Sequence, residues 1–127
     1  MTWIKRIFIF SVTAIGIYVV SIALFVMSPS ISDFFERTEF DSHVWINWED
    51  TESTQKDRWN MIHDLTKNYE LKGKTKIDVK KLLGEPLSES ENEMRYYLGL
   101  TGFGINTGSL TLNFDNGKVI SFNVWQG

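Results

Sequence analysis

The fold of the carboxyl-terminal half is decided by residues 110–124, which read LTLNFDNGKVISFNV. Apolar residues stand at every second position before the turn and again after it, which is the period of a half-buried β-strand. Between the two runs, Asn116-Gly117 favours a type I′ hairpin turn, because both residues tolerate positive φ. The residues that we expect to face the core are Leu110, Leu112, Phe114, Ile120, Phe122 and Val124. The stretch therefore predicts an antiparallel β-hairpin.

A further strand is expected before this hairpin. Met94, Tyr96 and Leu98 stand at alternate positions, so they predict the side of a strand that faces the core. Arg95 and Tyr97 then lie on the opposite side. Together with the hairpin, this strand predicts a three-stranded antiparallel meander.

Two helices are expected before the strands, the first over residues 54–69, where apolar residues recur at spacings of three and four. The second begins after Thr75, which can cap it together with Asp78. Gly84 followed by Pro86 ends it. The apolar positions of both helices are Trp59, Ile62, Leu65, Tyr69, Val79, Leu82 and Leu83. We therefore predict an α+β fold, in which two helices pack on a three-stranded antiparallel meander (ααβββ) in two layers.

One N-terminal transmembrane helix is predicted from Ile7 to Met27, a run without any charged residue. At about 1.5 Å per residue the run spans about 31 Å, close to the hydrocarbon thickness of a bilayer. Lys5 and Arg6 precede it and acidic residues dominate after it, so the amino terminus is expected in the cytoplasm. We therefore predict a single-pass protein of the cell membrane whose carboxyl-terminal domain is extracytoplasmic.

A cleaved signal peptide is the alternative interpretation of this run. Ser28 and Ser30 have the small-x-small spacing of a cleavage site, but Pro29 lies between them. The apolar run is also longer than the ~7–15 residues that are usual for a signal. We therefore favour an uncleaved anchor.

The chain divides into three parts by composition. Residues 1–27 form the membrane anchor (or signal), and residues 28–53 form an acidic, aromatic-containing tether and lead-in. Residues 54–127 form the soluble domain.

The lead-in holds more aromatic residues than a linker needs. We expect Phe34 and Phe35 at the bilayer interface. Trp45 and Trp48 are expected to pack on the domain. The alternation from Val44 to Trp48 permits a short edge strand.

The composition excludes several kinds of chemistry. There is no Cys, so disulfides, thiolate metal sites and thiol catalysis are excluded. Thirteen Lys and Arg against sixteen Asp and Glu give a net charge of −3, which argues against a nucleic-acid partner. The two histidines are His43 and His63, and His63 forms no dyad with Asp64 because adjacent residues on a helix do not face each other. We therefore predict no enzyme activity, no catalytic residues, no cofactor and no metal site.

Three polar clusters have a structural and a functional interpretation. The glycines favour a flexible connection between strands, with a contact loop as the alternative. The lysines favour a solvated helix face, with anionic lipid or an acidic partner as the alternative. The glutamates lack the spacing of a calcium loop and favour solvated chain. The glycine cluster is Gly99, Gly102, Gly104 and Gly108. The lysine cluster is Lys72, Lys74, Lys76, Lys80 and Lys81, and the glutamate cluster is Glu85, Glu89, Glu91 and Glu93.

The outer face of the predicted sheet supplies the candidate partner-binding residues, which are Arg95, Tyr97 and Trp125. These residue types are over-represented at binding hot spots, because they offer a large contact area with a polar group. A half-wet solvent face is the alternative interpretation. The other residues expected on this face are Thr111, Asn113, Ser121 and Asn123.

Three segments resemble the small outer-membrane assembly lipoprotein family (SmpA/OmlA type). They are Gly73–Pro86 with the sequence GKTKIDVKKLLGEP, Tyr96–Gly99 and Phe114–Val119. The resemblance covers residues 58–124 and implies a noncatalytic envelope domain of ααβββ form. Residues that look like the first helix of that family are Arg58, Met61, Asp64 and Leu65.

Family members carry a lipid on a cysteine after the signal, and this chain has no cysteine. The resemblance implies an outer-membrane assembly machine as the partner, but no motif in this sequence specifies that partner. We predict a membrane-anchored envelope protein whose small domain binds another protein or acts as a scaffold. One alternative is an immunity or inhibitor protein that blocks a toxin or hydrolase in the same compartment. Another is a hydrolytic or ligand-binding domain, which needs a deep pocket with convergent polar groups.

Overall fold

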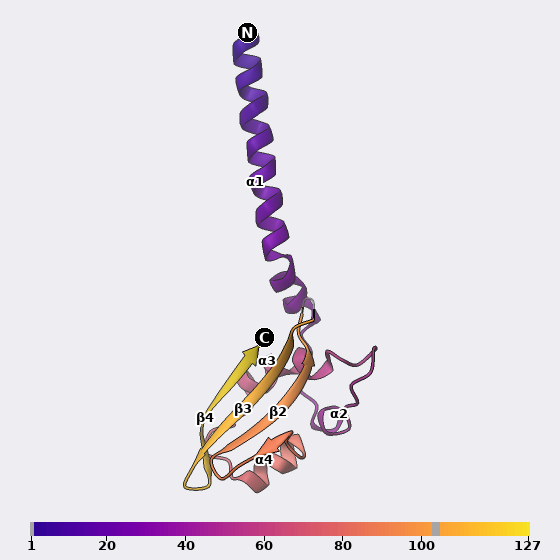
Figure 1. Cartoon of the computed structure of the whole chain (residues 1–127), viewed down its shortest axis with the longest axis vertical. Helices are drawn as coiled ribbons and strands as arrows, with labels where there is room; N and C mark the ends of the chain where they lie inside the picture. Colours follow the sequence, from indigo (N-terminus) through magenta and orange to yellow (C-terminus); the bar gives the residue numbers. More distant parts are fainter. Residues whose placement is uncertain (1, 103–104) are drawn as a thin grey trace.

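The computed structural model describes residues 2–102 and 105–127, with the side chains of residues 28–30 and 32 outside that description. The described residues form four helices and one antiparallel sheet of four strands (Figure 1). In order they are α1 (Trp3–Glu36), α2 (Ser42–Ile46), α3 (Asp57–Asn68), α4 (Lys76–Leu83), β1 (Ser88–Glu89), β2 (Glu93–Leu100), β3 (Thr107–Asp115) and β4 (Lys118–Gln126). Neighbouring strands in the sheet are also neighbours in sequence. The predicted α+β class and the apolar N-terminal helix are confirmed.

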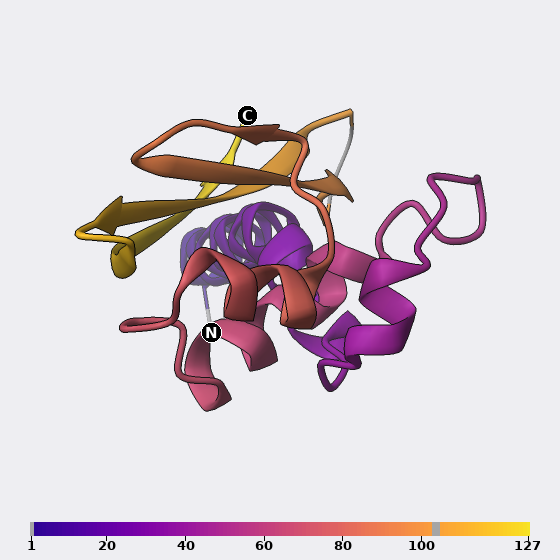
Figure 2. The ribbon, with the colours of Figure 1, turned by 90° about the horizontal axis from the view of Figure 1, so that it is seen from below.

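The domain after α1 has two layers, with the sheet on one side and α2, α3 and α4 on the other (Figure 2). Figure 1 views the sheet from the face opposite the helices. Most core positions predicted from periodicity are buried between the layers, where each large apolar side chain contributes about 1.5–3 kcal/mol. The core residues are Phe40, Trp45, Met61, Ile62, Leu65, Leu71, Val79, Leu83, Met94, Tyr96, Leu98, Leu110, Leu112, Phe114 and Val119.

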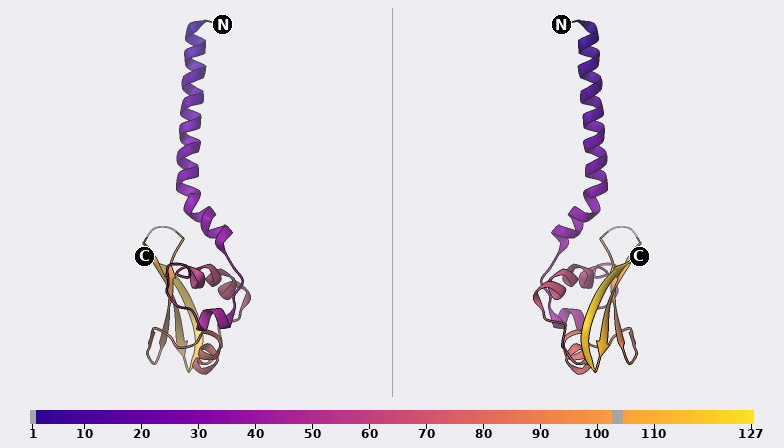
Figure 3. Two further views of the ribbon diagram at one scale, coloured as in Figure 1. Left: turned by 90° about the vertical axis from the view of Figure 1, so that its right-hand side faces the viewer. Right: turned by 90° about the vertical axis from the view of Figure 1, so that its left-hand side faces the viewer.

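The first helix projects away from the domain and carries the apolar run. Its segment Trp3–Met27 is long and apolar enough to cross a membrane, and a signal sequence near the N-terminus has the same features. The helix continues to Glu36, and its last turns bend away from the axis of the apolar segment (Figure 3). Pro29 lies in this helix and has no main-chain N–H to donate to the preceding turn. Proline is a common cause of helix bends for this reason.

The hairpin turn is confirmed, because Asn116 and Gly117 both have positive φ, 50° and 75°. The strand after it differs from the prediction at one position. Phe114 pairs with Val119 and the next pair joins Asn113 to Ser121, which leaves Ile120 as the extra residue of a β-bulge. The prediction that Ile120 faces the core is therefore wrong. Val119 is buried in its place, and Ile120 is 55% exposed.

The second predicted helix has the expected caps. The hydroxyl of Thr75 accepts a hydrogen bond from the main-chain N–H of Asp78 (3.2 Å). Gly84 ends the helix with φ 73°, a conformation that favours glycine. Its carbonyl accepts a hydrogen bond from the hydroxyl of Tyr96 (2.8 Å), which satisfies the polar end of a buried side chain.

The count of elements is larger than predicted. The suggested strand from Val44 to Trp48 is wrong, because Asp41 caps a short helix there by accepting from the N–H of Val44 (3.0 Å). That helix, α2, buries Trp45 completely. The polar stretch before β2 contains the short strand β1, which pairs with Met94 and Arg95, so the sheet has a fourth strand. The first of the two predicted helices, α3, begins at Asp57 and not at residue 54.

Candidate functional site

The candidate site lies on the outer face of the sheet. Strand register places Ser109 of β3 between Tyr97 of β2 and Trp125 of β4. The next row joins Arg95, Thr111 and Asn123 in the same order of strands. Because residues directly opposite on neighbouring strands lie side by side on one face, the two rows form one continuous surface. The structure thus brings the three predicted residues together.

A hollow of about 470 Å³ opens on this surface. The middle strand, β3, contributes small side chains to the hollow, while β2 and β4 on either side of it contribute larger ones. The exposed fraction of Trp125 is 56%, which is large for an indole. The lining residues are Leu87, Arg95, Tyr97, Thr107, Gly108, Ser109, Thr111, Asn123 and Trp125. The hollow therefore offers aromatic side chains around a floor of hydroxyl groups.

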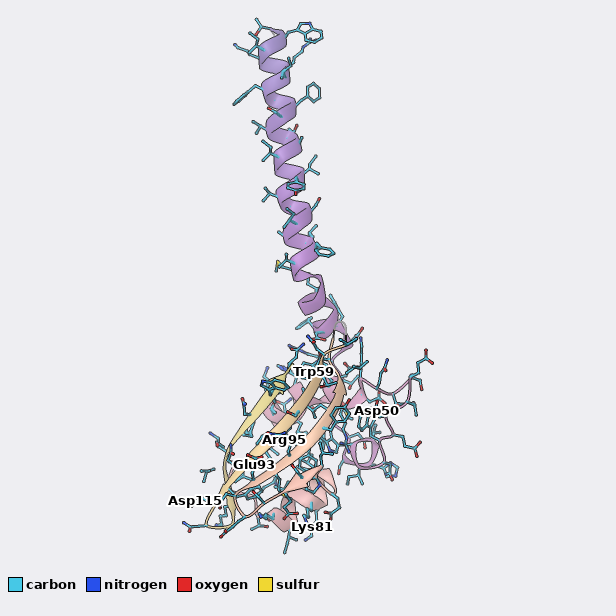
Figure 4. All side chains as sticks on the ribbon, in the orientation of Figure 1. Asp50, Trp59, Lys81, Glu93, Arg95 and Asp115 are labelled. Atoms are coloured by element: carbon cyan, nitrogen blue, oxygen red, sulfur yellow. The ribbon has the colours of Figure 1, made fainter. Side chains whose placement is uncertain are left out.

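Arg95 carries the positive charge of the hollow. Its side chain is exposed, and no carboxylate of the described residues lies within ion-pair distance of it. Figure 4 labels Arg95 and Glu93, which lies two residues before it on β2. None of the lining residues is acidic. An unpaired guanidinium beside aromatic rings favours a partner that presents a carboxylate.

The side chain of Tyr97 packs against Trp48 of the lead-in. Its ring lies 5.9 Å from the ring of Trp48, at a tilt of 48°. Burial raises the pKa of the Tyr97 hydroxyl, and the nearby charge of Asp50 raises it further. The hydroxyl therefore stays protonated at neutral pH and can donate a hydrogen bond to a partner.

Arg58 connects the lead-in to Tyr97 of β2. The sequence pattern did not predict this role. The guanidinium of Arg58 donates to the carbonyl of Trp45 from Nε (3.2 Å) and Nη2 (2.9 Å), and to the carbonyl of Tyr97 from Nη1 (3.0 Å). It also lies over the rings of Trp45 and Trp48, at 5.1 and 4.7 Å from the ring centres. Burial lowers the pKa of Arg58, which remains charged. Arg58 thus joins the lead-in to β2.

The two histidines lie at the surface, and Asp64 is hydrogen-bonded to the lead-in and to its own helix. His43 and His63 are both exposed. Asp64 accepts a hydrogen bond from the main-chain N–H of Phe40 (2.8 Å) and another from Nδ2 of Asn68 (2.5 Å), which lower the pKa of its carboxyl group. Its role is to fix the lead-in. Within the described residues, no three His, Cys, Asp or Glu side chains are grouped as metal ligands.

The lysine and glutamate clusters partly neutralise each other. Nζ of Lys80 lies 2.8 Å from Glu89 and 3.3 Å from Glu85, and Nζ of Lys76 lies 3.6 Å from Glu89. These contacts raise the pKa of Lys80 and lower that of Glu89. Lys81 is labelled at the end of the domain away from α1 (Figure 4). The cluster is therefore a solvated, partly paired surface remote from the apolar helix.

Two of the four glycines predicted for the connection lie inside strands instead, Gly99 in β2 and Gly108 in β3, and both are sites of close packing. Gly99 has φ 77°, and a Cβ atom there would lie 2.0 Å from the main-chain oxygen of Gln55. Gly108 lies against the ring of Trp59 in the same way. Gly104 lies outside the described residues. The expected positive φ is thus confirmed at Gly99, and the nearby oxygen of Gln55 also leaves no room there for a side chain.

No protein-family profile matches the chain, and no curated protein sequence matches it at a significant level. The resemblance to the outer-membrane assembly lipoprotein family stays a prediction from the residues quoted above.

Proposed function

We propose that this is a single-pass membrane-anchored envelope protein whose extracytoplasmic domain binds another protein through the outer-face hollow. The observation that supports this most strongly is the convergence of Arg95, Tyr97 and Trp125 on one hollow of about 470 Å³. The three residues come from two different strands, and their spacing follows from the register. Large, partly exposed aromatic side chains beside an unpaired arginine are typical of binding hot spots.

The apolar helix α1 supports the proposed anchor. Its apolar segment Trp3–Met27 has the length of a membrane span, and Lys5 and Arg6 are the only charges within it. The positive-inside rule supports a cytoplasmic amino terminus and an extracytoplasmic domain.

A noncatalytic role is favoured by the chemistry of the lining residues. Hydroxyl groups are present at Thr107, Ser109 and Thr111, but the lining has no histidine or carboxylate to act as a general base. A nucleophilic hydroxyl needs such a base within hydrogen-bond reach. Hydroxyl and amide groups without a base are suited to hydrogen bonding with a partner chain.

A photo-crosslinking amino acid at Asn123 tests the proposal in intact cells. We expect a discrete crosslinked protein at Asn123, and none when the same amino acid replaces the exposed Lys81 on the opposite layer. Tyr97→Ala together with Trp125→Ala should abolish the crosslink and leave the melting temperature within a few degrees of the parent. Undiminished crosslinking in the double variant would move the binding surface away from the hollow. A double variant that does not fold would make the two aromatic residues structural.

A further inference from the structure

We propose that the end of the domain nearest α1 rests on the surface of the bilayer that α1 crosses, with Ile105 in contact with lipid. This inference rests on the membrane anchor of the proposed function. It adds a second membrane contact, made by the folded domain and separate from the binding hollow. The argument starts from how the end of α1 is attached to the domain.

Two side-chain pairs attach α1 to the domain. Asp33 of α1 accepts a hydrogen bond from Nε1 of Trp59 in α3, 3.3 Å from Oδ1. Glu36, the last residue of α1, forms an ion pair with Lys56 at 3.3 Å. Trp59 lies in α3 and Lys56 is its N-cap residue, so both contacts attach the end of α1 to the start of α3.

Gly102, which follows β2 closely, joins the same attachment. Nζ of Lys56 also donates to the carbonyl of Gly102 (3.4 Å), and Gly102 lies so close to Asp33 that a Cβ atom there would overlap the carboxylate. At the base of the connection, the N–H of buried Thr101 donates to the carbonyl of Asn106 (2.9 Å). Gly102 therefore lies against α1, and Asn106, the residue after Ile105, is hydrogen-bonded to Thr101.

The length of α1 sets the height of this attachment above the hydrocarbon. Asp33 lies six residues after Met27, which is about 9 Å along a helix. The polar layer on each side of a bilayer is about 5–7 Å thick. The bend in α1 shortens the distance along the membrane normal (Figure 3). The ends of β2 and β3 that point toward α1 therefore lie at the level of the lipid headgroups.

Apolar side chains are exposed at this level. Ile105 is 93% exposed, and Phe35 near the end of α1 is 79% exposed. The acidic residues nearby have partners, since Asp33 bonds to Trp59 and Glu36 pairs with Lys56. Pairing reduces the cost of bringing these charges close to lipid.

Lipid is the occupant that this geometry favours. The covalent anchor gives Ile105 a high effective concentration at the bilayer surface, so a contact too weak for a free protein still forms. Lys81 of the lysine cluster lies at the opposite end of the domain (Figure 4), so the cluster adds no attraction to anionic lipid at this contact. The contact should therefore persist at high salt.

Spin labels on single cysteines test the contact in the full chain, which has no native cysteine. Ser21→Cys, Asn106→Cys and Asp115→Cys place labels in α1, beside Ile105 and at the distal hairpin. The chain is reconstituted in phosphatidylcholine vesicles, and the accessibility of each label to oxygen and to a water-soluble nickel chelate is measured. We expect the oxygen-to-nickel ratio to be highest at residue 21, intermediate at 106 and lowest at 115.

A second substitution isolates the role of Ile105. Ile105→Ser should lower the ratio at residue 106 toward that at 115. The matched Ile77→Ser, on the exposed face of α4, should leave it unchanged. A ratio at 106 equal to that at 115, or insensitive to Ile105→Ser, would overturn the inference while the anchor stands. A label at residue 21 that is accessible to nickel would overturn the anchor and the inference together.

Discussion

Replacing Arg58 by methionine should destabilise the domain strongly, although Arg58 is only half-buried. Methionine keeps the apolar part of the side chain and removes every donor. The carbonyls of Trp45 and Tyr97 then lose the charged group that now donates to them at 2.9–3.2 Å. The contacts of the guanidinium with the rings of Trp45 and Trp48 are lost as well.

The magnitude follows from these contacts. An acceptor left without a partner in a buried site costs about 1–3 kcal/mol, and two are involved. Each cation–π contact adds about 0.5–1 kcal/mol. The desolvation that lowers the pKa of Arg58 is relieved in the variant, which offsets part of the loss. We expect a net loss of about 3 kcal/mol, which for a domain of about 90 residues lowers the melting temperature by about 15 °C.

Near-ultraviolet circular dichroism of the full chain in nonionic detergent measures the transition. Arg95→Met is the matched control, because Arg95 is exposed and has no ion pair among the described residues, so it should change stability by less than about 0.5 kcal/mol. Arg58→Lys should lie between the two, since one ammonium group does not reproduce the planar fork of a guanidinium. Equal melting temperatures for Arg58→Met and Arg95→Met would refute the assigned role of Arg58.

Three further predictions concern other parts of the domain. Leu83→Asp should abolish the cooperative melting transition, because it places a charge at a fully buried position at a cost of several kcal/mol; a transition near that of the parent would show that Leu83 is not core. Asp64→Asn should be destabilising at neutral pH, and because hydrogen bonds lower the folded pKa of Asp64, urea midpoints of variant and parent should converge as pH falls below about 4. A constant difference across that range would contradict the assignment. Gly99→Ala should cost at least about 2 kcal/mol more than Gly117→Ala, because both have positive φ but only Gly99 faces a main-chain oxygen, and equal denaturation midpoints would disprove the steric role.

Local rules predict much of this fold because they depend on neighbouring residues in sequence. The Asn116-Gly117 turn and the Thr75 cap are local, and the structure has both. The bulge at Ile120 could not be predicted, since a two-residue period cannot show where one extra residue is inserted between two apolar ones. The short helix α2 had a local signal in Asp41, a favoured N-cap residue, which the apolar alternation from Val44 obscured.

The candidate site divides in the same way. Arg95, Tyr97 and Trp125 could all be assigned to the outer face from alternation along their strands. Arg58 could not be assigned, because its acceptors lie 13 and 39 residues away in sequence and are main-chain groups. Side-chain periodicity carries no information about such contacts.

The position of Arg58 also bears on where the domain begins. Packing continues across residue 53, since Phe40 and Trp45 from the lead-in are core residues. The carbonyl of Trp45 is one of the two acceptors of Arg58, and the other belongs to Tyr97. A chain that began after the lead-in would keep both helices and the whole meander, but its arginine would be half-buried with one acceptor missing. The lead-in is therefore part of what fixes the strand that presents Tyr97, and the proposed binding face depends on residues before the predicted start of the soluble domain at residue 54.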